Sequence, residues 1–115
     1  MTMRLTFIRQ LPVILTSCAV GAMTGPASAA DASKAMLESG KKLVLEAKCD
    51  ACHINKVGGD GSAIYSRQDR RVTIKSKLLP QVERCNSQLG LGLFPDDEAA
   101  IAAYLNSAHY KFKDE

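Results

Sequence analysis

The chain has 115 residues, of which 46% are hydrophobic and 23% are charged, a composition typical of one small globular domain. Its formal net charge is +3, and only +1 without the first 29 residues, because that segment holds two of the 15 basic residues and none of the 12 acidic ones. A balance this close to neutral excludes net charge as the main determinant of what the protein binds.

Residues 1–29 are typical of a secretory signal peptide. Arg4 and Arg9 precede an apolar stretch from Leu11 to Met23, after which come Gly25-Pro26 and Ala27-Ser28-Ala29, an A-x-A cleavage pattern. The stretch is shorter than the about 20 apolar residues that a membrane-spanning helix needs, so we predict no membrane span. We expect residues 30–115 to form one soluble domain that is exported to the periplasm.

A second interpretation of this segment stays open. Leu15-Thr16-Ser17-Cys18 is also similar to the cleavage site of a lipoprotein, which would leave Cys18 lipidated and the protein anchored to a membrane. The apolar stretch continues past Cys18 into a complete A-x-A site, and this continuation favours the signal peptide.

The first predicted element of the mature domain is a helix over residues 32–48. Apolar or small residues recur there at intervals of three and four and form one stripe: Met36, Gly40, Leu43, Val44 and Ala47. A glycine inside a helix costs about 1 kcal/mol relative to alanine. The position of Gly40 on the stripe therefore predicts close approach by another backbone, and the last helix is the expected partner.

Directly after this stripe comes Cys49-Asp50-Ala51-Cys52-His53, a C-x-x-C-H motif. In this motif two thiols attach to the vinyl groups of haem and the adjacent imidazole binds the iron. Attachment requires reduced thiols outside the cytoplasm, which agrees with an export signal. We therefore expect one covalent haem c per chain, attached to Cys49 and Cys52, with His53 as the proximal iron ligand.

Two later segments bear on binding. Residues 58–62 are rich in glycine and predict a turn, but they lack the Lys-Ser/Thr ending of a phosphate loop, so we expect no nucleotide there. Five basic residues opposed only by Asp69 then form the basic cluster: Arg67, Arg70, Arg71, Lys75 and Lys77. The cluster suits an acidic redox partner, and a solvated surface without a partner is an equal alternative. The compartment disfavours nucleic acid.

Two further helices are expected. Pro80 begins a short one that ends at Gly90, with four apolar residues on one face: Leu78, Val82, Cys85 and Leu89. Pro95 and three acidic residues begin the last one, which carries a second stripe: Ile101, Tyr104, Leu105, Ala108 and Phe112. No strand pattern or internal repeat is visible, so we predict an all-α fold.

This arrangement resembles the class I cytochrome c family. The resemblance rests on the helix with Gly40, the haem motif at its end and the last helix with Tyr104, and it covers essentially the whole mature chain. It implies crossed terminal helices around one haem and electron transport. No proline follows His53 where the family usually has one, so we expect a backbone carbonyl near Gly58 or Gly59 to orient the imidazole.

The distal methionine of that family is missing, so the second iron position is either taken by another group or open. Met36 is the only methionine outside the signal peptide, and its helix is expected to pack away from the distal face. Cys85, Asn86, His109 and an open position are the alternatives. Cys85 is favoured because it lies about ten residues before Pro95, where class I cytochromes carry this ligand. His109 is disfavoured because it lies near the end of the last helix, which we expect to face Gly40 rather than the iron.

A narrower resemblance points to the same cysteine. Residues 81–89 and 96–105 resemble the distal segment of haem domains in thiosulfate dehydrogenases, in SoxA proteins and in small proteins of the NaxL and NaxS type. The resemblance implies that Cys85 ligates the iron. Because a thiolate stabilises ferric iron, it also implies a low reduction potential.

Three functions are consistent with such a site. One-electron transport by a protein that is not itself an enzyme is favoured. A displaceable Cys85 would instead suit a protein that binds nitric oxide or carbon monoxide, and the narrower resemblance would suit a haem subunit of an enzyme that oxidises sulfur compounds. If Cys85 does not bind iron, it is a buried thiol or joins two chains in a homodimer or heterodimer. A zinc site of Cys49, Cys52, Cys85 and His109 is disfavoured because it leaves His53 unexplained.

Overall fold

The computed structural model describes residues 28–113, and this part of the chain is helical and contains no strand, as predicted. The predicted signal peptide, apart from its last two residues, lies outside the described residues, as does Cys18. Among the described helices, none combines the length and the apolar character that crossing a membrane requires.

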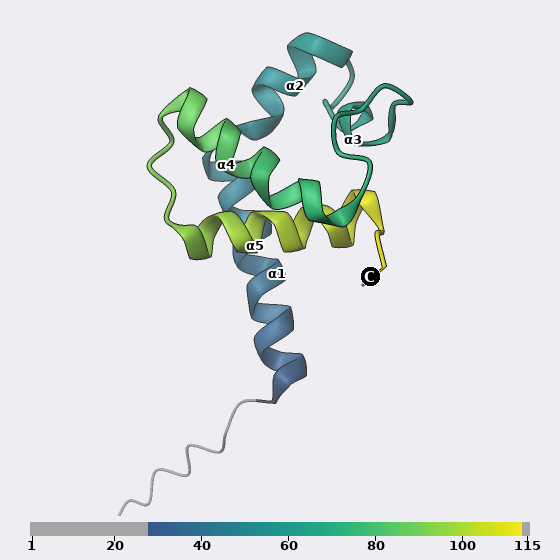
Figure 1. Cartoon of the computed structure of the whole chain (residues 1–115). Helices are drawn as coiled ribbons and strands as arrows, with labels where there is room; N and C mark the ends of the chain where they lie inside the picture. The colour runs from purple at the N-terminus through teal and green to yellow at the C-terminus, as the bar shows by residue number, and fades with distance from the viewer. Residues whose placement is uncertain (1–27, 114–115) are drawn as a thin grey trace, which may run out of the picture.

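Five α-helices and two shorter turns make up this part of the chain (Figure 1). The α-helices are α1 (Ala29–Glu46), α2 (Cys49–Val57), α3 (Ala63–Ser66), α4 (Leu78–Leu89) and α5 (Pro95–Leu105). A 3-10 turn, η1 (Lys75–Lys77), leads into α4, and a π-helical turn, η2 (Asn106–Tyr110), follows α5.

The crossing of α1 and α5 is the most extensive contact between any two elements (Figure 1). Gly40 lies at the crossing, because a Cβ atom added there would overlap the carbonyl oxygen of Ala100 and lie 2.8 Å from the Cβ of Tyr104. The prediction that Gly40 packs against the last helix is confirmed. The predicted stripe is shorter than expected, since Val44 is buried but Met36 is 40% exposed.

The C-x-x-C-H motif lies on a helix of its own, α2, rather than at the end of the first helix. Lys48 adopts a left-handed conformation, with φ 51° and ψ 40°, between the two helices. A left-handed residue ends a right-handed helix, so the chain changes direction before Cys49. The first helix consequently ends at Glu46, two residues before the predicted boundary.

The core is formed mainly by α4, α5 and the segment before α4. Its largest buried residues come from five parts of the chain: Val44, Tyr65, Val72, Leu78, Val82, Ile101 and Leu105. The helix predicted to begin at Pro80 begins at Leu78. Pro80 therefore lies in the first turn, where the missing backbone N–H of a proline costs no hydrogen bond within the helix. Its end at Gly90 is as predicted, and the four residues of its predicted apolar face all line one cavity, although Leu89 is 53% exposed.

The last helix begins at Pro95 as predicted but ends earlier than its apolar stripe. Regular α-helix stops at Leu105, and η2 follows. Asn106 then holds the turned-back chain, because its Oδ1 accepts from the Phe112 N–H at 2.9 Å and its Nδ2 donates to the Phe112 carbonyl at 3.1 Å. Ala108 is exposed, so its predicted place on the stripe is wrong, whereas Phe112 packs against the core from outside the helix.

Candidate functional site

A cavity of about 510 Å³ lies between α2, α3, α4 and α5. Its volume is within the range of about 300–1,000 Å³ that is usual for small-molecule and cofactor sites. The predicted site residues Cys49, Cys52, His53 and Cys85 all line it. The fold therefore brings the C-x-x-C-H motif of α2 and Cys85 of α4 to one cavity.

The two thiols of the motif differ in environment. Cys49 is partly buried, and burial is the main reason why the pKa of its thiol is raised, with smaller contributions from Asp50 and Cys85. Cys52 is exposed at the edge of the same cavity. Neither forms a disulfide, so both thiols are free to react.

The imidazole of His53 is mostly shielded, with 19% of its side chain exposed. Burial lowers the pKa of His53, although the nearby Asp50 carboxylate acts in the opposite direction. The neutral imidazole is therefore favoured, and this is the form that binds a metal ion.

Tyr65, on α3, supports this imidazole. Its hydroxyl oxygen lies 3.1 Å from Nδ1 of His53. The side chain is buried, and burial raises the pKa of Tyr65, so the phenol stays protonated. The expected carbonyl near Gly58 or Gly59 is not the partner of His53 in the described structure. The hydrogen-bond partner of His53 is instead Tyr65, which the sequence analysis did not identify.

The turn between α2 and α3 makes this contact geometrically feasible. Gly61 has φ +82°, a conformation that residues with a side chain rarely adopt. A Cβ atom at Gly61 would also lie 2.9 Å from the Cβ of His53. The close return of the chain over α2 therefore requires glycine at this position and carries Tyr65 back to the histidine.

His109 lies beside Tyr65 and not at the cavity. The two rings are stacked with centroids 4.4 Å apart, and His109 is exposed in η2. The last helix faces Gly40 as expected, but it does not continue regularly to His109, which lies in η2. Its ring contacts the tyrosine that supports His53, so His109 is not placed to be the second ligand of the same metal.

Cys85 is the one distal candidate with a side chain at the cavity. It is partly buried, and the Gln81 side chain donates from Nε2 to its sulfur at 3.5 Å. The Asn86 side chain is used elsewhere. Its Oδ1 accepts a hydrogen bond from the Leu93 N–H, and its Nδ2 donates to the Leu93 carbonyl. The same Nδ2 donates to Glu98 Oε1 at 2.7 Å.

The alternative zinc site is not assembled in residues 28–113. His109 is absent from the cavity that holds the three cysteines, and no three His, Cys, Asp or Glu side chains of this range are grouped to hold a metal ion. The donors that the described structure does bring to one cavity are the thiols of Cys49, Cys52 and Cys85 and the imidazole of His53.

Some side chains of the basic cluster form hydrogen bonds or an ion pair within the chain, and others line a cavity. Arg67 forms an ion pair with Asp69, and Arg70 donates to the backbone carbonyls of Arg67 and Val72. Arg71 and Lys77 are exposed and line a smaller cavity of about 350 Å³, which shares part of its wall with the larger one. Positive charge is therefore concentrated beside the candidate site.

Comparison of the chain with protein-family models, curated proteins and solved structures gave no significant match.

Proposed function

We propose that this chain is a small exported c-type cytochrome that carries single electrons. Cys49 and Cys52 would attach one haem covalently, His53 would be its proximal ligand and Cys85 its distal ligand. The all-α fold with crossed terminal helices is compatible with the class I cytochrome fold, which we include in the proposal.

One observation carries the proposal. The C-x-x-C-H motif and Cys85 line the same cavity, although Cys85 lies 32 residues after His53 in the sequence. The remaining wall of this cavity is largely apolar. Buried apolar residues such as Val72, Leu78 and Ile101 form part of the cavity wall and suit the apolar faces of a haem. The cations at its edge, among them Lys56 and Arg70, suit the two carboxylates of a haem.

A bound haem would supply an iron that changes between the ferric and ferrous states by one electron. The chain's own groups set the conditions of this change. For Nε2 of His53 to bind iron, Nδ1–H must donate to the Tyr65 hydroxyl, which fixes the tautomer and strengthens the imidazole as a ligand. The Cys85 thiolate adds a negative charge that favours the ferric state and lowers the potential.

The test is the chemical state of the purified mature protein after expression with its own leader in a host that matures c-type cytochromes. We expect an intact mass equal to residues 30–115 plus one haem, and an alkaline pyridine spectrum typical of two thioether bonds. A Cys49→Ala, Cys52→Ala variant should lose the covalent haem. A wild-type protein with no covalent haem would end the proposal.

Replacement of Tyr65 with phenylalanine tests the support of His53. Loss of one hydrogen bond worth about 0.5–1.5 kcal/mol corresponds to about 20–60 mV for one electron. We expect the midpoint potential to rise by this amount, because the imidazole becomes a weaker donor to ferric iron. Redox titration measures the shift.

Tyr104→Phe is the matched control for that experiment. Tyr104 also lies near His109, with ring centroids 6.4 Å apart, but no hydrogen bond joins it to His53. Its potential should stay within a few millivolts of wild type. Equal shifts in the two variants would contradict a specific role of the Tyr65 hydroxyl.

The basic cluster is part of the proposal as a docking surface for an acidic redox partner. We expect electron exchange with ferricyanide, a trivalent anion, to slow severalfold between about 10 and 150 mM salt, because the Debye length falls from about 30 to 8 Å. At low salt Lys77→Gln should slow the exchange about twofold to threefold. Stopped-flow absorption measures both rates.

Lys41→Gln removes the same charge from an exposed position on α1. It should leave the low-salt rate almost unchanged. An effect as large as that of Lys77→Gln would show that net charge, and not the cluster, attracts the anion.

A further inference from the structure

The smaller cavity has a wall of unusual charge. It is formed by the loop before η1, by η1 and by the first turns of α4, and seven residues line it: Arg71, Val72, Ser76, Lys77, Pro80, Gln81 and Arg84. Three of them are cationic and none is acidic. The ion pairs found within residues 28–113 involve other side chains, so neither Arg71 nor Arg84 has an acidic partner there.

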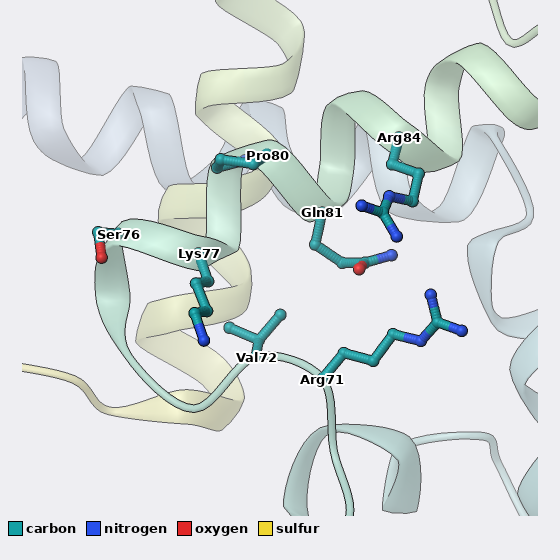
Figure 2. A pocket seen from close by; sticks show the side chains of 7 residues that line it. All are labelled: Arg71, Val72, Ser76, Lys77, Pro80, Gln81 and Arg84. Atoms are coloured by element: carbon teal, nitrogen blue, oxygen red, sulfur yellow. The ribbon is translucent and has the colours of Figure 1, made fainter.

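The polar groups of this wall converge. Figure 2 shows the guanidinium groups of Arg71 and Arg84 and the amide of Gln81 extending toward the same region, although Arg71 and Arg84 come from different segments. Two like charges held together without a counter-charge are unfavourable, and an anion between them relieves the repulsion. Each guanidinium also offers a planar pair of N–H donors that matches two oxygens of one anion.

Gln81 lines both cavities and joins them. Its Nε2 donates to the sulfur of Cys85 at 3.5 Å, and an amide nitrogen carries a second hydrogen that remains for an acceptor in the smaller cavity. The two arginines and Lys77 are exposed, so a solute reaches the site directly from solvent.

We propose that Arg71, Gln81 and Arg84 form a binding site for a small inorganic oxyanion such as sulfate or phosphate, with Lys77 raising the local positive potential. Arg84 and Lys77 do not line the larger cavity, which distinguishes this site from the proposed cofactor site. The proposal does not depend on which cofactor, if any, the larger cavity holds.

Isothermal titration of the purified mature protein with sulfate tests the site, in chloride buffer of constant ionic strength. We expect one saturable site per chain. Arg84→Gln should weaken the affinity by about tenfold or more, the effect of losing one charge-assisted pair of hydrogen bonds. Arg84→Lys keeps the charge but not the planar donor pair, and it should restore only part of the affinity.

Lys41→Gln, which removes one exposed positive charge far along the chain from this cavity, should leave the affinity within about twofold of wild type. Circular dichroism of each variant verifies that the fold is kept. Absence of saturable sulfate binding to the wild-type protein overturns the proposal. This holds also if the reason is that a haem carboxylate already lies between the two arginines. Equal losses in Arg84→Gln and Lys41→Gln overturn it as well, because they indicate only general attraction of anions.

Discussion

Replacing Cys85, the proposed distal ligand of the proposed haem, with alanine is expected to change the ferric protein from low spin to high spin and to raise its midpoint potential by on the order of 100 mV or more. Axial ligands set haem potentials over a range of about 0.8 V, so loss of an anionic ligand is a large change. The thiolate charge stabilises the ferric state, and its removal favours the ferrous state. Electron spin resonance and redox titration measure the two effects.

The same variant is expected to bind carbon monoxide in the ferrous state without displacing a protein ligand. Gln88→Ala is the matched control, because Gln88 is an exposed α4 residue that lines the same cavity. It should keep the wild-type spin state, potential and carbon monoxide response. A low-spin ferric spectrum that is unchanged in Cys85→Ala would remove Cys85 from the iron and return it to the structural thiols.

The limits of sequence interpretation are clearest around His53. The spacing of Cys49, Cys52 and His53 identifies the C-x-x-C-H motif without any knowledge of the fold, because the motif spans only five consecutive residues. Tyr65 could not be found in the same way. It lies on a four-residue helix that is too short for a periodic pattern, and it reaches His53 only through a turn that depends on the conformation of Gly61. The glycine-rich turn was the only signal that the chain folds back there.

The distal candidates illustrate the same limit. Cys85 and Asn86 are neighbours in the sequence, and both residue types bind metals, so pattern alone left both open. The structure separates them by tertiary contacts: the Asn86 amide holds the loop that leads to α5, whereas the Cys85 sulfur lies at the cavity. The place of His109 also depends on tertiary structure, because the regular α-helix ends at Leu105 and His109 lies in η2, stacked on Tyr65.

Gly40 is a position where the sequence signal was sufficient, and it gives the second large prediction. Gly40→Ala is expected to destabilise the protein by about 2 kcal/mol or more, even though alanine is the better helix former by about 1 kcal/mol. The added Cβ would overlap the Ala100 carbonyl oxygen, which is backbone and cannot move to another rotamer. Relief requires α1 and α5 to separate along their crossing, which loosens the most extensive contact of the fold.

Urea unfolding of the mature protein, followed by circular dichroism, measures this cost as a lower midpoint at an unchanged slope. Ser39→Ala is the matched control, since Ser39 is the preceding residue of α1 and is exposed. It gains helix propensity without a new contact, so we expect a stabilisation of up to about 0.5 kcal/mol. If Gly40→Ala stabilised the protein to the same extent, α1 and α5 would not touch at this residue. Because a domain of this size has only about 5–15 kcal/mol of stability, the predicted loss should also lower the yield of folded protein at 37 °C.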